Sequence, residues 1–129
     1  MPVTETLLSA RIFDQLRLAM AADPDAFTDL YRDYLADAWQ SLQILQEAVG
    51  TGQVEMIRAK AHYLKSGSLV LGAPDVARGA AMLEEAAMAG DSDSFDALLE
   101  RIATAVNDTQ AELSERLGSG VIPGDDTAT

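Results

Sequence analysis

The class of fold can be read from residues 24–50, whose sequence is PDAFTDLYRDYLADAWQSLQILQEAVG. Asp23 is placed to cap the first turn of a helix there, with Pro24 at the first helical position, and Gly50 and Gly52 favour its end. Apolar or small residues recur with the spacing of one buried helix face: Phe27, Leu30, Tyr31, Tyr34, Leu35, Ala38, Leu42, Leu45 and Val49. The stretch predicts one long amphipathic helix.

Four other stretches have the same helical period. They predict a short helix over about residues 9–21 and longer ones over 54–71, 74–89 and about 93–117. Connections of about three to five residues force sequential helices to lie antiparallel. Alternating runs of Val, Ile and Thr, which are typical of strands, are absent. We therefore expect an all-α fold, an antiparallel up-down four-helix bundle with a short extra N-terminal helix.

The chain of 129 residues is long enough for one domain with a continuous core. We assign residues 9–117 to the helical bundle and residues 1–8 to an N-terminal extension. Residues 118–129 show no period, and we expect them to form a disordered C-terminal tail.

Composition excludes several classes of function. The chain has no cysteine and one histidine, which excludes disulfide frameworks, thiolate zinc sites, cysteine nucleophiles and centres with several histidine ligands. A net charge of -12 argues against nucleic acid or an anionic membrane as partner. No stretch approaches the roughly 20 apolar residues of a membrane span, and the first residues lack the pattern of a signal peptide. We expect a soluble, cytoplasmic protein.

The single histidine lies within Ala61-His62-Tyr63-Leu64-Lys65-Ser66-Gly67-Ser68, in the helix expected over residues 54–71. At 100° per residue, His62 lies roughly 130° from the centre of the apolar arc. The imidazole should therefore face solvent, with Lys65 at i+3 and Ser66 at i+4 beside it. The arc itself consists of Ile57, Ala61, Leu64, Ser68 and Leu71.

These residue types suit phosphoryl transfer. An exposed imidazole is a good nucleophile near neutral pH, and Lys65 supplies a point charge suited to a phosphoryl oxygen. Gly67 costs the helix about 1 kcal/mol relative to alanine, and the small Ser66 beside it leaves room for close approach. A lone exposed histidine usually has no role. The lysine, the small serine and the glycine that occur together around His62 are, however, hard to explain by packing. The pattern predicts a phosphoacceptor site.

The segment from Ala61 to Ser68, followed by Leu71-Gly72-Ala73, resembles the signature of histidine-containing phosphotransfer (HPt) domains. That signature is usually written His-x-Leu-Lys-Gly-Ser, with Gly-Ala ten residues after the histidine. Leu83-Glu84 and Gly90-Asp91 also match pairs typical of the family. The similarity covers roughly residues 9–117, with one departure: this chain has Ser66 then Gly67, where family members more often have Gly then Ser.

The resemblance implies a four-helix bundle in a two-component phosphorelay. Its exposed histidine, here His62, accepts a phosphoryl group from a receiver-domain aspartate and passes it to another. Lys65 would be the electrostatic partner of His62, and Ser66 with Gly67 the clearing for the receiver. Partners would be receiver domains of response regulators and hybrid histidine kinases. The receiver would supply Mg²⁺, and this chain would need no cofactor of its own. As a single domain, it is expected to act as a freestanding monomeric shuttle, with a fragment of a larger hybrid kinase as the alternative.

The sequence also indicates which residues could contact a receiver domain and which reactions the chain is not expected to catalyse. Ala59 and Leu69 are candidate docking contacts, because Leu69 is a large apolar residue within about 20° of His62 on the helical wheel. The chain has no GxxxxGK[ST] nucleotide loop, so we expect a phosphocarrier that neither binds ATP nor phosphorylates itself. A serine hydrolase is disfavoured, because no GxSxG motif and no orienting acid in helical register with His62 is present.

Two points stay open at this level. Glu84 and Glu85 point about 100° apart on a helix, so we expect both to be solvated surface, although some HPt domains carry a glutamine that contacts the histidine at the position of Glu84. Two other functions are a non-catalytic helical module that docks on and regulates receiver or kinase domains, and a plain helical scaffold. His62 with Lys65 favours the carrier, because a docking module needs no nucleophile.

Overall fold

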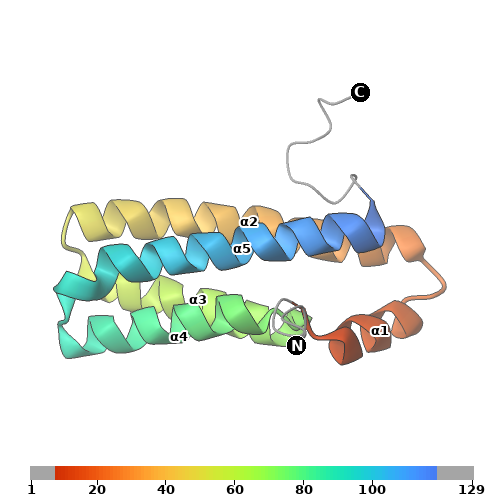
Figure 1. Ribbon diagram of the computed structural model, residues 1–129, viewed down its shortest axis with the longest axis horizontal. Coiled ribbons are helices and arrows are strands. Elements are labelled where there is room, and N and C mark those ends of the chain that lie inside the picture. Colours follow the sequence, from red (N-terminus) through yellow and green to blue (C-terminus); the bar gives the residue numbers. More distant parts are fainter. Residues whose placement is uncertain (1–7, 119–129) are drawn as a thin grey trace, which may run out of the picture.

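The computed structural model describes residues 8–118, and the described part is built from helices. They are α1 (Ala10–Ala19), α2 (Pro24–Gly50), α3 (Val54–Leu71), α4 (Pro74–Ala89), the 3-10 turn η2 (Ser92–Ser94) and α5 (Phe95–Leu117). Helices α2 to α5 lie along the long axis of the molecule, each running opposite to the one before it, and α1 lies at one end (Figure 1). The all-α helical bundle predicted from the sequence is confirmed.

Helices α1 and α2 begin directly after residues whose side chains cap the first turn, Ser9 and Asp23. Asp23 Oδ1 accepts a hydrogen bond from the backbone N–H of Ala26 at 3.1 Å, which caps α2 as expected. The last helix begins at Phe95 rather than near residue 93, because residues 92–94 form the 3-10 turn. The short helix α1 is also two residues shorter at its C-terminal end than the pattern predicted.

The turn between α3 and α4 fixes the position of α1. Gly72 in this turn has φ +78°, a conformation that favours glycine. Its carbonyl accepts a hydrogen bond from the backbone N–H of Ser9 at 2.6 Å. A Cβ at Gly72 would lie 3.0 Å from the Cβ atoms of both Ser9 and Ile12, so only glycine lets α1 approach this closely.

The boundary of the expected N-terminal extension lies within the core. Leu8 is only 2% exposed and packs with the buried residues of the bundle. The rest of that extension, residues 1–7, and residues 119–129 of the expected tail lie outside the described residues.

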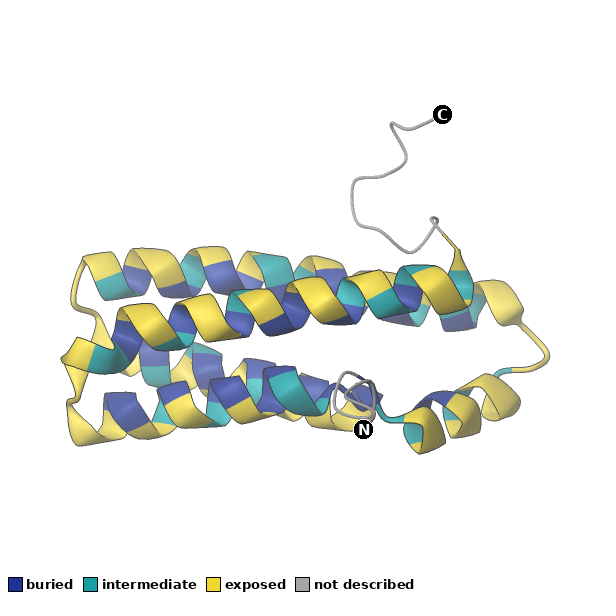
Figure 2. Ribbon diagram, in the orientation of Figure 1, coloured by how far each residue is buried: buried dark blue, intermediate teal, exposed yellow. Residues whose placement is uncertain are grey.

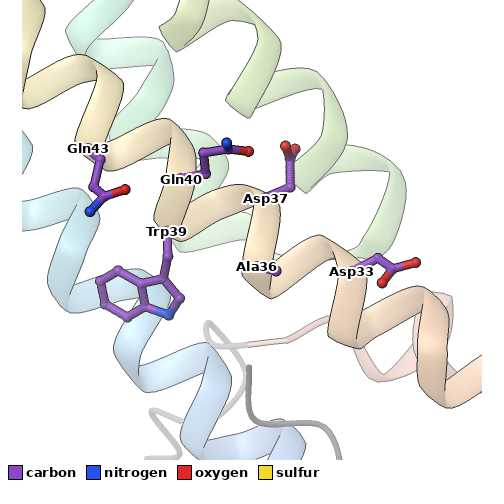
Figure 3. A pocket seen from close by; sticks show the side chains of 6 residues that line it. All are labelled: Asp33, Ala36, Asp37, Trp39, Gln40 and Gln43. Atoms are coloured by element: carbon purple, nitrogen blue, oxygen red, sulfur yellow. The ribbon is translucent and has the colours of Figure 1, made fainter. Parts of the chain in front are cut away.

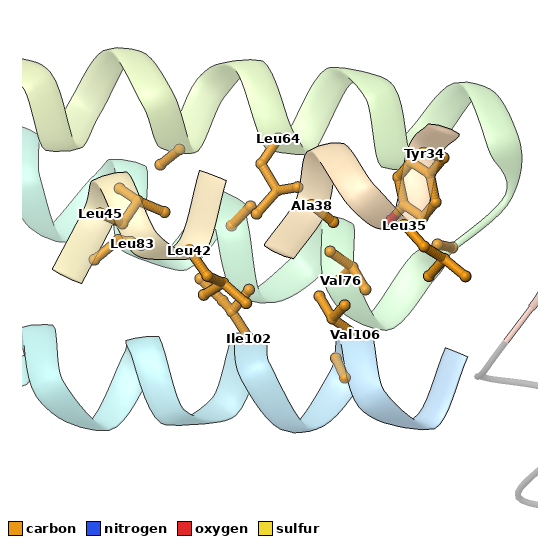
Figure 4. Packing of buried hydrophobic residues seen from close by; sticks show 14 of the residues in the cluster. Tyr34, Leu35, Ala38, Leu42, Leu45, Leu64, Val76, Leu83, Ile102 and Val106 are labelled. Carbon is orange, nitrogen blue, oxygen red and sulfur yellow. The ribbon is translucent and has the colours of Figure 1, made fainter. Parts of the chain in front are cut away.

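The core fills the space between the four long helices, whose inward faces are buried and whose outward faces are exposed (Figure 2). Helices α2, α3, α4 and α5 all contribute aliphatic side chains to it (Figure 4). The arc predicted for residues 54–71 is confirmed, because the buried residues of α3 are Ile57, Ala61, Leu64, Ser68 and Leu71.

Two tyrosines of α2 fasten the C-terminal half of α3. The Tyr34 hydroxyl and Ser68 Oγ share a hydrogen bond of 2.7 Å, and the Tyr31 hydroxyl donates to the Leu71 carbonyl at 2.9 Å. Burial raises the pKa of each tyrosine to about 12, so both keep their protons at neutral pH. The helix that carries His62 is therefore held to α2 by polar contacts as well as by packing.

Candidate functional site

His62 lies in the middle of α3, on the side away from the core. Its neighbour Ala61 is buried, as is Leu64, whereas the His62 side chain is 56% exposed. The prediction that the imidazole faces solvent is confirmed. A helix anchored on its inner face thus presents the ring to whatever approaches from outside.

A carboxylate from the neighbouring helix α4 joins His62 to Lys65. Glu84 Oε2 lies 2.9 Å from His62 Nδ1, and Glu84 Oε1 lies 2.9 Å from Lys65 Nζ. The Glu84 side chain is only 13% exposed. The expectation that Glu84 and Glu85 are both solvated surface is therefore wrong for Glu84 and holds for Glu85, which is exposed.

The packing of α4 against α3 explains the position of Glu84. The preceding residue, Leu83, is fully buried in the core. The next residue on a helix is rotated by about 100°, which brings Glu84 to the border between the two helices. There its carboxylate reaches across to the exposed side of α3, while Glu85 turns outward.

The contact with Glu84 assigns the protons of the imidazole ring. A carboxylate is only an acceptor, so Nδ1 must carry the hydrogen that lies between it and Glu84 Oε2. In the uncharged ring the lone pair is then on Nε2. Glu84 thereby holds the ring in one orientation and leaves Nε2 as the nitrogen able to react.

The charge of Glu84 depends on its two partners. The hydrogen bond from Lys65 lowers the pKa of Glu84 below its usual value of 4.5, against the opposing effect of desolvation, and the hydrogen bond from His62 lowers it further. Because the folded protein holds this proton less tightly than the unfolded chain, the interaction stabilises the fold above pH ~4.5. That stabilisation is lost as the pH falls through the lowered pKa.

The other residues singled out in the sequence lie around His62 on the outer surface of α3. Ala59, Ser66 and Gly67 are exposed, and Leu69 is 58% exposed although it is a large apolar residue. A Cβ added to Gly67 would meet no atom within 4 Å. Of these predicted residues, the described contacts link Lys65 to His62, through Glu84, while the others lie on the exposed surface of α3.

Tyr63, next to His62, is held in place by residues on two helices. Its hydroxyl donates a hydrogen bond to Asp37 of α2, which raises the pKa of Tyr63. The Lys60 ammonium lies 4.4 Å from the centre of its ring. The side chain is nonetheless half exposed, so it forms a fixed aromatic surface beside the imidazole. Sequence patterns on α3 alone do not reveal the contact with α2.

A shallow hollow elsewhere on the surface has no comparable chemistry. In Figure 3, Trp39 points toward α5 whereas Asp37 points to the other side of α2. Trp39 Nε1 donates to Gln110 Oε1 at 2.8 Å, and Asp37 accepts from Tyr63, so both side chains serve contacts between helices. The hollow is lined by Asp33, Ala36, Asp37, Trp39, Gln40 and Gln43.

Residues 8–118 contain neither a metal-binding cluster nor a membrane-spanning helix. No group of three or more His, Cys, Asp or Glu side chains in that range is arranged to hold a metal ion. No helix in the same range is both long enough and apolar enough to span a membrane.

Comparison with known proteins adds a family and a structural relative. The family model described as the Hpt domain matches residues 29–112. The crystal structure of histidine-containing phosphotransfer protein B (HptB) from Pseudomonas aeruginosa PAO1 is similar to this chain, with a TM-score of 0.79 and 26% sequence identity over 84% of this chain and 92% of that one. No curated protein sequence matches significantly.

Proposed function

This chain belongs to the Hpt domain family, and from that premise we propose that it carries phosphoryl groups on His62 between receiver domains of a two-component phosphorelay. The observation that carries the proposal is the exposed imidazole whose Nδ1 is bound by Glu84 at 2.9 Å. Such a ring offers Nε2 to an incoming phosphoryl group without needing to reorient. The similarity to HptB, named as a histidine-containing phosphotransfer protein, supports the same role.

The proposed step is an attack by the Nε2 lone pair of His62 on the phosphorus of a receiver aspartyl phosphate. The N–P bond forms while the bond from phosphorus to the aspartate oxygen breaks, and the bonding electron pair leaves with the aspartate carboxylate. Since Nδ1 keeps its proton, the ring gains positive charge during attack. The Glu84 carboxylate stabilises this charge as it develops. Transfer to a second receiver is the reverse reaction.

Lys65 is suited to hold the transferred group. An ammonium has three hydrogen-bond donors, and in the unphosphorylated protein the described contact of Lys65 is with Glu84 Oε1 at 2.9 Å. The remaining donors are available to oxygens of a phosphoryl group on Nε2, one helical turn away. The receiver domain would hold the Mg²⁺ that neutralises charge during transfer, so this chain contributes the nucleophile and its immediate partners.

The surface around His62 is suited to a docking receiver. Ala59 and Leu69 offer exposed apolar contacts, while Ser66 and Gly67 leave space for the receiver to approach the ring. Because the chain lacks a GxxxxGK[ST] nucleotide loop, we assign it the role of a carrier rather than that of an ATP-dependent kinase. The cytoplasm is the compartment that we propose for this role.

The experiment is transfer of labelled phosphate from a phosphorylated receiver domain to the purified chain. The wild type should acquire label that is labile to acid and stable to alkali, as expected for phosphohistidine, and His62→Gln should acquire none. Circular dichroism should show that His62→Gln is folded, since the replaced side chain is half exposed. Label on His62→Gln would refute the site, and a receiver that binds the wild type without labelling it would favour a regulatory docking module.

A further inference from the structure

Arg58 lies one helical turn before His62 on the same side of α3. Side chains at i and i+4 are neighbours on a helix surface, with Cβ atoms about 5–6 Å apart. Arg58 is paired with Glu55: its Nε donates to Glu55 Oε2 at 2.8 Å, and its Nη2 lies 2.7 Å from the same oxygen. The guanidinium thus points away from His62 in the unphosphorylated protein.

Two pairs of opposite charge on α3 and α4 lie near His62 before phosphorylation. Arg58 and Lys65 are the cations, and Glu55 and Glu84 are their respective acidic partners. The pKa of Arg58 is raised first by its hydrogen bond and charge contact with Glu55 and, to a lesser degree, by the charge of Glu84. Arg58 therefore lies within electrostatic reach of the acid that contacts His62. A phosphoryl group would add close to two negative charges to these two pairs.

The two cations differ in how easily they can leave their partners. Glu84 is only 13% exposed and depends on Lys65 for a hydrogen bond, so removing Lys65 would leave a poorly solvated carboxylate. Glu55 is 79% exposed, so water replaces Arg58 at little cost. A phosphoryl group offers more negative charge than one carboxylate and accepts the two parallel hydrogen bonds of a guanidinium.

We propose that Arg58 exchanges Glu55 for the phosphoryl group when His62 is phosphorylated, and so acts with Lys65 as a second cation that holds the phosphohistidine. The proposal rests on His62 being the phosphoacceptor. In this account Lys65 keeps Glu84 in place throughout, while Arg58 responds to the state of His62. Glu55 holds Arg58 ready without competing strongly for it.

The test is a ³¹P NMR titration of the chain phosphorylated on histidine with phosphoramidate, which requires no receiver. A nearby cation lowers the pKa of the phosphoryl group. Relative to wild type, Arg58→Gln should raise that pKa by about half a unit, the size expected for one unit charge about 5 Å away in water. Arg58→Lys should restore most of the difference, and Glu55→Gln should give a value at or below that of wild type.

Arg78→Gln is the matched control, because Arg78 forms the same kind of exposed pair with Asp75 on α4 at 3.0 Å. It should leave the phosphoryl pKa at the wild-type value. If the phosphoryl pKa is the same in wild type and Arg58→Gln, with phosphohistidine present in both, the role of Arg58 is overturned while the proposed function stands. Absence of any phosphohistidine signal from the wild type would overturn the proposed function and this inference with it.

Discussion

The acid that orients His62 comes from another helix, because α3 has no acid within one turn of His62. The residues one turn from His62 on α3 are Arg58, Ala59, Lys65 and Ser66, and none carries a carboxylate. Glu84 fills this need from α4, with one oxygen on the imidazole and the other on the ammonium of Lys65. A single carboxylate thus contacts both the proposed nucleophile and the cation proposed to hold its product.

Substitution of Glu84 should separate orientation from charge. In Glu84→Gln the amide oxygen can still accept the Nδ1 hydrogen bond, but no negative charge opposes the charge that develops on the ring. In Glu84→Ala both contributions are lost. We expect single-turnover transfer from a receiver to slow by about 10-fold in Glu84→Gln and by about 100-fold in Glu84→Ala, the range given by a hydrogen bond to a charged group worth ~1.5–3 kcal/mol.

The matched control for these variants is Glu85→Gln, since Glu85 is the exposed neighbour on the same helix. It should transfer at the wild-type rate. Wild-type rates in Glu84→Ala, measured by quench-flow with a saturating receiver, would show that the carboxylate has no part in transfer.

At the scale of the helix, α3 shows what sequence can and cannot predict. The burial of Ile57, Leu64 and Leu71 and the exposure of His62 follow from the 3.6-residue period of α3 itself, so both were predictable. The contacts of His62 with Glu84 and of Tyr63 with Asp37 depend on how α4 and α2 are rotated against α3. No period within one helix contains that information. The burial of Leu83 places Glu84 only at the border between α4 and α3, without showing which residue of α3 it meets.

Two helical glycines should respond oppositely to alanine. At Gly67 a Cβ meets nothing within 4 Å, so Gly67→Ala should raise the free energy of unfolding by about 0.5–1 kcal/mol. At Gly79 a Cβ would lie 2.9 Å from Ile102 Cγ1 in the α4–α5 contact. Crowding there costs ~1–3 kcal/mol, which cancels or exceeds the gain in helix propensity from alanine. Gly79→Ala should therefore lower the free energy of unfolding by up to ~2 kcal/mol. Urea unfolding monitored by circular dichroism measures both.

The variant Gly67→Ala also tests whether a receiver domain docks at Gly67. Gly67→Ala should accept phosphate from phosphoramidate at the wild-type rate but from a receiver more slowly, because only the receiver must approach the helix surface. Equal stabilisation by both alanines would contradict the close contact at Gly79, and unchanged transfer from a receiver to Gly67→Ala would show that Gly67 is not a docking contact.

At the scale of the whole molecule, a chain of net charge -12 has on its surface a site to which two cations, Arg58 and Lys65, contribute. The class of fold was predictable because helix period, capping residues and short connections are local signals that agree with one another. The pairing of the four charged residues near His62 was not predictable, because they come from α3 and α4 and their contacts across the two helices depend on packing. The fold thus supplies a surface on which His62, the proposed nucleophile, is exposed and its charged partners are arranged around it.

If Glu84 holds His62 through Nδ1, Nε2 is the nitrogen that receives the phosphoryl group. The most direct measurement is ¹H–¹⁵N and ³¹P NMR of the His62 ring before and after phosphorylation with phosphoramidate. We expect the uncharged ring to carry its proton on Nδ1 before the reaction, and phosphorus to be bonded to Nε2 afterwards. A proton on Nε2 in the unmodified protein, or phosphorus on Nδ1 in the product, would contradict this expectation.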